Sequence, residues 1–244
     1  MAWLAAAFFC IALLYASVGF GGGSSYAAIL AFAQVDYRLL PLMALSCNIV
    51  VVAGSMMRFA RAGIVPWRRA LGLTAFAAPA ALLGGLTPID EAAFLILLGA
   101  SLVLTAFAMV VPVPQTSGDP TRAARFAPLA AAPLGYLAGL VGIGGGIFLA
   151  PLLHLTRWAE ARAVAATASL FILVNSLFGL AGHMVKGGEG RFLAAIDFGL
   201  PLIVAVAIGG QIGSLLAVRF IPQRWIRIVT AVLIGAVGVR LLAM

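Results

Sequence analysis

The chain has 244 residues, of which 64% are hydrophobic and only 9% are charged. Soluble domains carry about 25% charged residues, so this composition excludes an ordinary soluble protein and indicates a membrane protein. The formal net charge of +8 fits the basic loops that orient membrane proteins, so we expect the lipid bilayer and no nucleic acid as a partner.

The apolar segments follow one another in chain order. They lie at residues 2–18, 24–33, 40–57, 70–87, 92–111, 127–141, 147–155, 163–182, 198–218 and 225–243. At about 20 residues per crossing, these segments leave no room for a soluble catalytic domain. The first segment lacks the basic start of a signal peptide, so we expect it to belong to the mature protein.

Catalytic and metal-binding patterns are not evident in the sequence. There is no H-E-x-x-H or C-x-x-C sequence and no Ser, His and Asp set, and Cys10 and Cys47 lie in apolar surroundings. We therefore expect no enzyme activity, no metal site and no cofactor.

The two halves of the chain repeat one another. Gly19-Phe20-Gly21-Gly22-Gly23 matches Gly142-Ile143-Gly144-Gly145-Gly146 at an offset of 123 residues, which also pairs Ser46 with Ser169. Gly84-Gly85 matches Gly209-Gly210 at an offset of 125. Chance coincidence among 28 glycines is the alternative. We expect an N-terminal repeat at 1–111, a linker rich in proline and polar residues at 112–126, and a C-terminal repeat at 127–244.

The basic residues indicate how the repeats are oriented. If each glycine run joins two short segments into a hairpin, followed by three transmembrane helices, the repeats are inverted and the Lys and Arg residues divide eleven against three. The cytoplasmic side then holds Arg58, Arg61, Arg68, Arg69, Arg122, Arg125, Arg157, Arg162, Arg219, Arg224 and Arg227, and the other side holds Arg38, Lys186 and Arg191. Four full crossings per half would give parallel repeats and only eight against six. The expected fold is an all-α polytopic membrane protein with two inverted repeats.

The glycine runs are candidate ligand sites. Glycine allows positive φ and close approach of a ligand, and the helix that begins after each run presents unpaired N–H groups and a positive dipole end, which bind anions. The candidate substrate-binding residues are Gly21, Gly22, Gly23, Ser24, Ser25, Ser46, Asn48, Gly144, Gly145, Gly146, Thr167, Ser169 and Asn175. The alternative is helix packing by small residues, which we expect for the isolated pairs Gly84-Gly85 and Gly209-Gly210.

The acidic residues favour an anionic over a cationic substrate. All seven lie in loops or at the ends of apolar segments, at Asp36, Asp90, Glu91, Asp119, Glu160, Glu189 and Asp197. A buried carboxylate relay, which is usual in proton and cation pumps, therefore has no evident carrier.

At these residues the chain resembles the TauE/SafE family of sulfite-exporter-like membrane proteins. The resemblance rests on Phe20-Gly21-Gly22-Gly23 and Ile143-Gly144-Gly145-Gly146. Residues 160–170, E-A-R-A-V-A-A-T-A-S-L, are similar to the family's A-V-G-T-S-L sequence, and Gly63-Ile64-Val65-Pro66-Trp67 to its G-N-V-D-W turn. Ala44-Leu45-Ser46-Cys47-Asn48 departs from the family's threonine-serine pattern.

The resemblance implies a secondary transporter in the cytoplasmic (inner) membrane that exports a small sulfur-containing anion such as sulfite by alternating access. An importer of thiosulfate, sulfate or sulfoacetate remains open, as does a membrane scaffold that transports nothing. The expected partners are a small inorganic or organosulfonate anion, the bilayer and a second copy of the chain in a homodimer.

Overall fold

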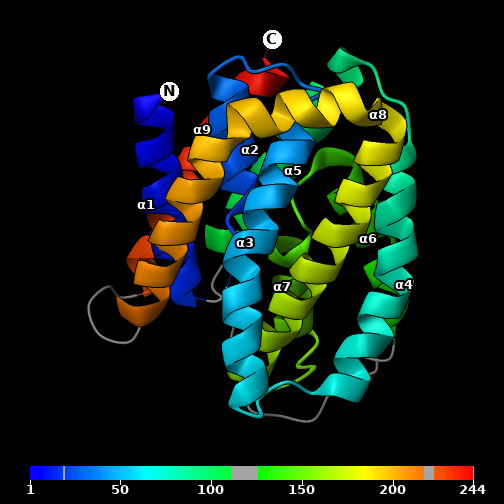
Figure 1. Ribbon diagram of the computed structural model, residues 1–244. Coiled ribbons are helices and arrows are strands. Elements are labelled where there is room, and N and C mark those ends of the chain that lie inside the picture. The colour runs from blue at the N-terminus through cyan, green and yellow to red at the C-terminus, as the bar shows by residue number, and fades with distance from the viewer. Residues whose placement is uncertain (19, 111–125, 217–222, 244) are drawn as a thin grey trace.

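The computed structural model describes residues 1–18, 20–110, 126–216 and 223–243, and this part of the chain contains helices and no strand (Figure 1). The first half forms α1 (Ala2–Val18), α2 (Gly23–Phe32), α3 (Leu40–Arg61), α4 (Trp67–Leu86) and α5 (Glu91–Val110). The second half forms α6 (Ala127–Val141), α7 (Gly146–Leu155), α8 (Ala161–Leu216) and α9 (Gln223–Leu242). Residues 112–125 of the expected linker lie outside the described residues.

One expected loop is replaced by a break in a long helix. The sequence predicts separate segments at 163–182 and 198–218, but α8 runs through residues 183–197. Its helical geometry fails at Gly188, where φ is 70° and ψ is 173°. Figure 1 shows α8 rising, bending across the top of the molecule and descending beside α1. The expected loop is wrong because a single glycine suffices to turn the chain.

Helix length separates two kinds of segment. Among the described residues, five segments are long and apolar enough to cross a membrane: α3, α4, α5 and the two parts of α8, Ala161–Gly188 and Gly190–Gly213. The helices beside the glycine runs are shorter, with 17 and 10 residues in α1 and α2 and 15 and 10 in α6 and α7. A helix of 10 residues is about 15 Å long, half of a bilayer core. These lengths agree with the expected multi-pass helical protein.

Glycine allows the helices to pack backbone against backbone. A Cβ added at Gly84 of α4 would collide with the carbonyl oxygen of Tyr136 in α6, and one at Gly209 of α8 would collide with that of Phe9 in α1. The second glycine of each pair also faces a helix, since Gly85 lies against Gly179 and Gly210 against Val51. The isolated glycine pairs therefore pack helices, as expected.

The long helices α3 and α8 cross the middle of the molecule and form one of its most extensive contacts. Figure 1 shows α3 descending beside the rising first part of α8, so α3 and this part of α8 run in opposite directions. The short helix α2 packs on α3, and α7 packs on α8. The starts of both short helices are thereby brought to the centre of the fold.

Candidate functional site

In each glycine run, the next-to-last glycine is left-handed and the last glycine is the first residue of a short helix. The residue that precedes α2 is Gly22, with φ of 80°, and the residue that precedes α7 is Gly145, with φ of 75°. Gly142 and Gly144 also have positive φ, both of 81°. Neither helix start has a side-chain cap, although the N–H of Phe148 in the first turn of α7 donates to the carbonyl oxygen of Gly145 at 3.1 Å. Two positive helix ends are therefore available to a ligand.

The two glycine runs meet at Asn48 of α3. Its side chain is fully buried, and Nδ2 donates a hydrogen bond to the carbonyl oxygen of Ile143 at 3.2 Å. Cβ atoms added at Gly21 or Gly23 would collide with the Asn48 amide, and one at Gly144 would lie 2.7 Å from Nδ2. One amide from the first half of the chain therefore contacts both runs, and larger residues in the runs would displace it.

Several polar atoms at this centre have no hydrogen-bond partner. They are Oδ1 of Asn48, Oγ of Ser176 and the hydroxyl of Tyr26, all in buried side chains. A Cβ at Gly144 would lie 3.1 Å from Oγ of Ser176, so that hydroxyl also faces the second run. A buried polar atom without a partner costs about 1–3 kcal/mol. Unpartnered polar atoms beside a helix start are expected where a polar ligand binds and supplies the missing hydrogen bonds.

A small cavity of about 10 Å³ lies between the runs. It is lined by Tyr15, Phe20, Gly21, Gly22, Gly23, Ser24, Asn48, Ile143, Ile147 and Ile172. This volume is about that of one water molecule, so an oxyanion does not fit in this conformation. The described lining is neutral, which leaves hydroxyl, amide and backbone N–H groups as the available donors.

The first half supplies most of the polar side chains. Ser24 lines the cavity, and the hydroxyls of Ser25 and Tyr15 are hydrogen-bonded to each other at 3.0 Å. The corresponding positions after the second run are Ile147 and Phe148. A Cβ at Gly145 would meet Ala138 and Phe171, which are both apolar. The two halves thus share a backbone design but not its side-chain chemistry.

The other predicted site hydroxyls point to their own helices. Oγ of Ser46 donates to the carbonyl oxygen of Leu42 at 2.7 Å. Thr167 and Ser169 likewise donate to the carbonyl oxygens four residues before them, at 2.8 and 2.9 Å. Asn175 is buried with both polar amide atoms unpartnered. Neither Asn175 nor Ser176 lines the cavity, but Ser176 faces Gly144 of the second run.

Sequence reasoning missed four residues of this centre. Tyr15 and Tyr26 count as hydrophobic residues in the composition, and Ile143 contributes only a backbone carbonyl. Ser176 directly follows the predicted Asn175, one position along the same helix. A helical wheel of α8 that was anchored on the second glycine run could have identified Ser176.

The described carboxylates are exposed and are not buried at this centre. Asp36, Asp90, Glu91, Glu160 and Asp197 are all exposed. Asp119 and the side chain of Glu189 lie outside the described part of the chain. The described residues thus place no acidic group at the glycine-run centre.

The chain is similar to known membrane transporter proteins along nearly its whole length. A family model described as "Sulfite exporter TauE/SafE" matches residues 4–241. A probable membrane transporter protein of Sinorhizobium fredii is 34% identical over 98% of this chain and 97% of its own length. Another from Methanocaldococcus jannaschii is 26% identical over 96% of the chain and 92% of its own length. No solved structure matches the chain.

Proposed function

Because the chain belongs to the sulfite exporter TauE/SafE family, we propose that it is a secondary transporter that exports a small sulfur oxyanion such as sulfite. The anion binds between the two glycine runs. It accepts hydrogen bonds from the first-turn N–H groups of α2 and α7 and from Ser24, Asn48 and Ser176. The relatives are named as probable membrane transporter proteins, which supports a transport role for this chain.

The observation that carries this proposal is the meeting of two uncapped helix starts at one buried amide. Asn48 contacts both glycine runs, and the hydroxyl of Ser176 next to it has no partner. Two positive helix ends without a neighbouring carboxylate favour an anion. Neutral donors also allow the anion to leave, which a transporter requires.

Alternating access agrees with the size of the central cavity. A space of about 10 Å³ holds about one water molecule, so an anion enters only after the hairpins α1–α2 and α6–α7 move apart. Corresponding helix pairs support this motion, because α4 packs on α6 as the second part of α8 packs on α1. Inverted repeats exchange such environments when the carrier opens to the other side.

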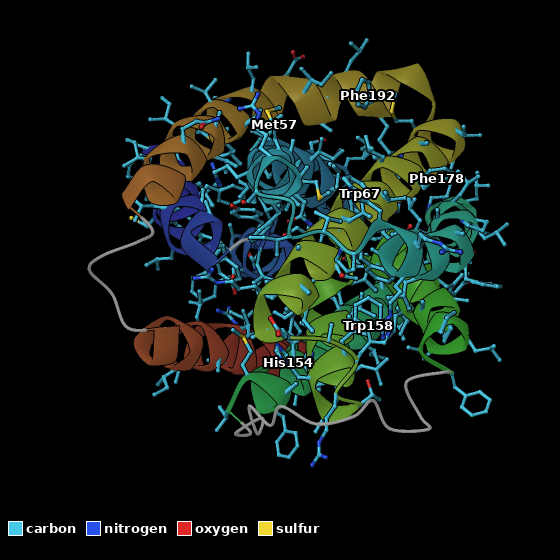
Figure 2. All side chains as sticks on the ribbon, turned by 90° about the horizontal axis from the view of Figure 1, so that it is seen from below. Met57, Trp67, His154, Trp158, Phe178 and Phe192 are labelled. Atoms are coloured by element: carbon cyan, nitrogen blue, oxygen red, sulfur yellow. The ribbon has the colours of Figure 1, made fainter. Side chains whose placement is uncertain are left out.

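The basic residues set the proposed orientation. Arg69 of α4 donates to the carbonyl oxygen of Trp158 at 2.6 Å and stacks over its ring at 4.1 Å. This contact joins the start of α4 to the loop after α7. Figure 1 shows the turn between α3 and α4 at the bottom of the molecule, and Figure 2, seen from below, shows Trp67 and Trp158 on the side away from α1. Arg58, Arg61, Arg157 and Arg162 lie beside these loops in sequence, so we assign this end to the cytoplasmic side of the inner membrane.

Flux through liposomes tests the function. Purified protein is reconstituted and loaded with labelled sulfite, and efflux is measured with sulfate, thiosulfate and sulfoacetate as competitors. We expect protein-dependent sulfite efflux that a second sulfur anion inhibits. Flux driven inward under every physiological gradient would indicate an importer instead. The absence of flux for all four anions under every gradient would overturn the proposal.

A further inference from the structure

A second and larger cavity opens at the end of the molecule opposite Trp158. Its volume is about 310 Å³, and it is lined by Tyr37, Arg38, Pro41, Pro88, Ile89, Phe94, His183, Lys186 and Arg191. The lining comes from the turn before α3, the turn before α5, and both sides of the break in α8. This cavity is therefore separate from the small cavity between the glycine runs.

The lining gathers cations without a carboxylate. Arg38, Lys186 and Arg191 are the three basic residues that the sequence assigns to the side opposite the arginine-rich loops, and all three line this one cavity. None of the described lining residues is acidic. Like charges gathered around a common space repel one another, and an anion between them relieves the repulsion.

Among the carboxylates whose side chains are described, those near this cavity make other hydrogen bonds or lie outside the lining. Oδ1 of Asp36 accepts a hydrogen bond from the backbone N–H of Arg38 at 2.9 Å, and Oδ2 of Asp90 accepts one from that of Ala93 at 3.2 Å. Glu91 makes the smallest of the contributions that raise the pKa of Arg38. The Asp36 and Asp90 carboxylates therefore stabilise their own turns, and the three cations face the cavity.

Lys186 and Arg191 lie on the two sides of the break in α8. Nζ of Lys186 donates to the carbonyl oxygen of Thr87 at 3.0 Å, which leaves further N–H donors on the ammonium. The break at Gly188 separates Lys186 from Arg191, and a Cβ at Gly187 would lie 3.1 Å from Cδ of Arg191. The helix break thus brings two cations of one helix to the same cavity.

Arg38 and His183 complete the arrangement. Nε of Arg38 donates to the Tyr37 hydroxyl at 3.2 Å, and this hydrogen bond raises the pKa of Arg38, so its guanidinium stays charged. Nε2 of the buried His183 donates to the carbonyl oxygen of Gly139 at 2.8 Å, which ties α8 to α6 below the cavity. Donors on the guanidinium groups therefore remain available for a ligand.

The cavity lies directly behind the second glycine run. Pro41 lines the cavity, and a Cβ at Gly142 would lie 2.5 Å from Cα of Pro41. Gly142 begins the run that leads to the N-terminus of α7. Pro41 therefore connects the lining of this cavity to the start of the second glycine run.

We propose that this cavity is a second anion site, in which Arg38, Lys186 and Arg191 hold a small oxyanion at the outer face before it enters or after it leaves the central site. The place of this anion on a transport path rests on the proposed function. The volume of about 310 Å³ accommodates a hydrated oxyanion, which the cavity at the glycine runs does not.

Side-specific kinetics test this site. Initial rates of labelled sulfite uptake are measured in right-side-out and inverted membrane vesicles for the wild type and for an Arg38→Gln/Arg191→Gln double variant. Because solvent-exposed charge pairs are weak, loss of two charged donors should raise KM about tenfold from the outer face, with kcat and the KM from the inner face little changed. A Lys186→Gln change should add to the effect.

A matched control removes the same charge outside the cavity. Arg240 stacks over Phe32 of α2 at 4.7 Å and does not line the cavity. Arg240→Gln should leave KM within about twofold of the wild type, because an exposed charge acts only through the screened surface potential. An equal rise in KM for Arg240→Gln would overturn the site, as would an unchanged KM in the double variant. Absence of wild-type flux would instead contradict the proposed function.

A lipid headgroup offers the same oxyanion chemistry as a free ion, so the assay is repeated in two lipid mixtures. Liposomes of phosphatidylcholine alone contain no anionic headgroup, and a parallel set contains phosphatidylglycerol. If the free anion binds, the KM difference between wild type and double variant persists in both mixtures. A difference that requires phosphatidylglycerol would overturn the proposal in favour of a lipid site. An Arg38→Lys/Arg191→Lys variant should partly restore the wild-type KM.

Discussion

Asn48 links the two halves of the chain at a single amide. It belongs to α3 in the first half, yet Nδ2 donates to Ile143 in the glycine run of the second half. Both runs approach this amide so closely that an added Cβ would collide with it or displace it. In the proposed transporter, this residue would therefore couple substrate contact to the relative position of the two hairpins.

Replacement of Asn48 by alanine should reduce sulfite flux more than tenfold. Hydrogen bonds to a charged ligand contribute about 1.5–3 kcal/mol, and alanine removes this donor and the bridge to Ile143. Initial flux in proteoliposomes at matched protein density measures the effect. The control on the same helix is Ser46→Ala, because the Ser46 hydroxyl already donates to Leu42. Equal losses in the two variants would contradict a specific role for Asn48.

Valine at Gly22 or Gly145 should abolish flux while the protein still inserts. Both residues have positive φ, which is severely strained for a β-branched residue, and a Cβ at Gly145 would lie 2.8 Å from Cβ of Ala138. Flux and membrane insertion are measured together. Gly72→Ala provides the control, because nothing lies within 4 Å of an added Cβ there. Normal flux in Gly145→Val would mean that the runs only pack helices.

Residues whose role depends on the local backbone could be predicted from the sequence, whereas residues that depend on long-range contacts could not. Gly22 and Gly145 belong to clusters that indicate broken helices wherever they occur. Ser176 reaches the second run only because α8 packs against α7 with one particular rotation. Ser46 and Ser169 match in the repeat, but their hydroxyls bond within their own helices. The repeat pattern identifies equivalent positions and not side-chain direction.

At the scale of elements, the hairpin helices pack on long helices through glycine. Gly84 fits α4 against α6, and Gly209 fits the second part of α8 against α1. In lipid, this close approach replaces the hydrophobic driving force that packs helices in water. The two contacts are equivalent in the repeat and should be similarly sensitive to added volume.

Valine at Gly84 or at Gly209 should destabilise the protein to a similar extent. Overpacking costs about 1–3 kcal/mol, and here the obstacle is a backbone carbonyl that cannot rotate away. Thermal unfolding in detergent, followed by loss of the monodisperse peak, measures the change in Tm. Gly72→Ala should leave Tm unchanged or raise it slightly. A large loss at only one of the two glycines would contradict their equivalence.

Helix boundaries in the apolar segments followed the sequence closely, since α1 and α6 coincide with the predicted 2–18 and 127–141. The exception is α8, where Lys186-Gly187-Gly188-Glu189-Gly190-Arg191 has the composition of a loop. Helical hydrogen bonding nevertheless continues on both sides of Gly188. A polar glycine-rich stretch interrupts a helix in water, but contacts such as that of Lys186 with Thr87, the residue that follows α4, hold this stretch in place here.

At the scale of the whole molecule, charge and polarity are distributed differently between the halves. The polar side chains of the central site come mainly from the first half, whereas two of the three cations of the outer cavity come from α8 in the second. The described end around Trp158 carries Arg58, Arg61, Arg68, Arg69, Arg157 and Arg162. The two halves therefore share a backbone arrangement but contribute different side chains, mainly neutral polar groups from the first half and cations from the second.

Cysteine accessibility tests the inverted arrangement most directly. Gly63 and Gly188 both have positive φ and would strain a cysteine, so exposed neighbours without that geometry are better sites. In a background with Cys10→Ala and Cys47→Ala, single cysteines replace Ala62, Glu160 or Gly190. Parallel repeats would place Ala62 and Gly190 on the same side, because they follow equivalent helices.

The contact between Arg69 and Trp158 requires positions 62 and 160 to share one side, because it joins their loops. We expect an impermeant maleimide to label position 190 from outside intact cells, and positions 62 and 160 only in inverted vesicles. Positions 62 and 160 serve as controls for each other, because they lie in different halves of the chain but should be labelled from the same side. Labelling of positions 62 and 190 from the same side would refute inversion, and alternating access would then need a mechanism that does not exchange the two hairpins.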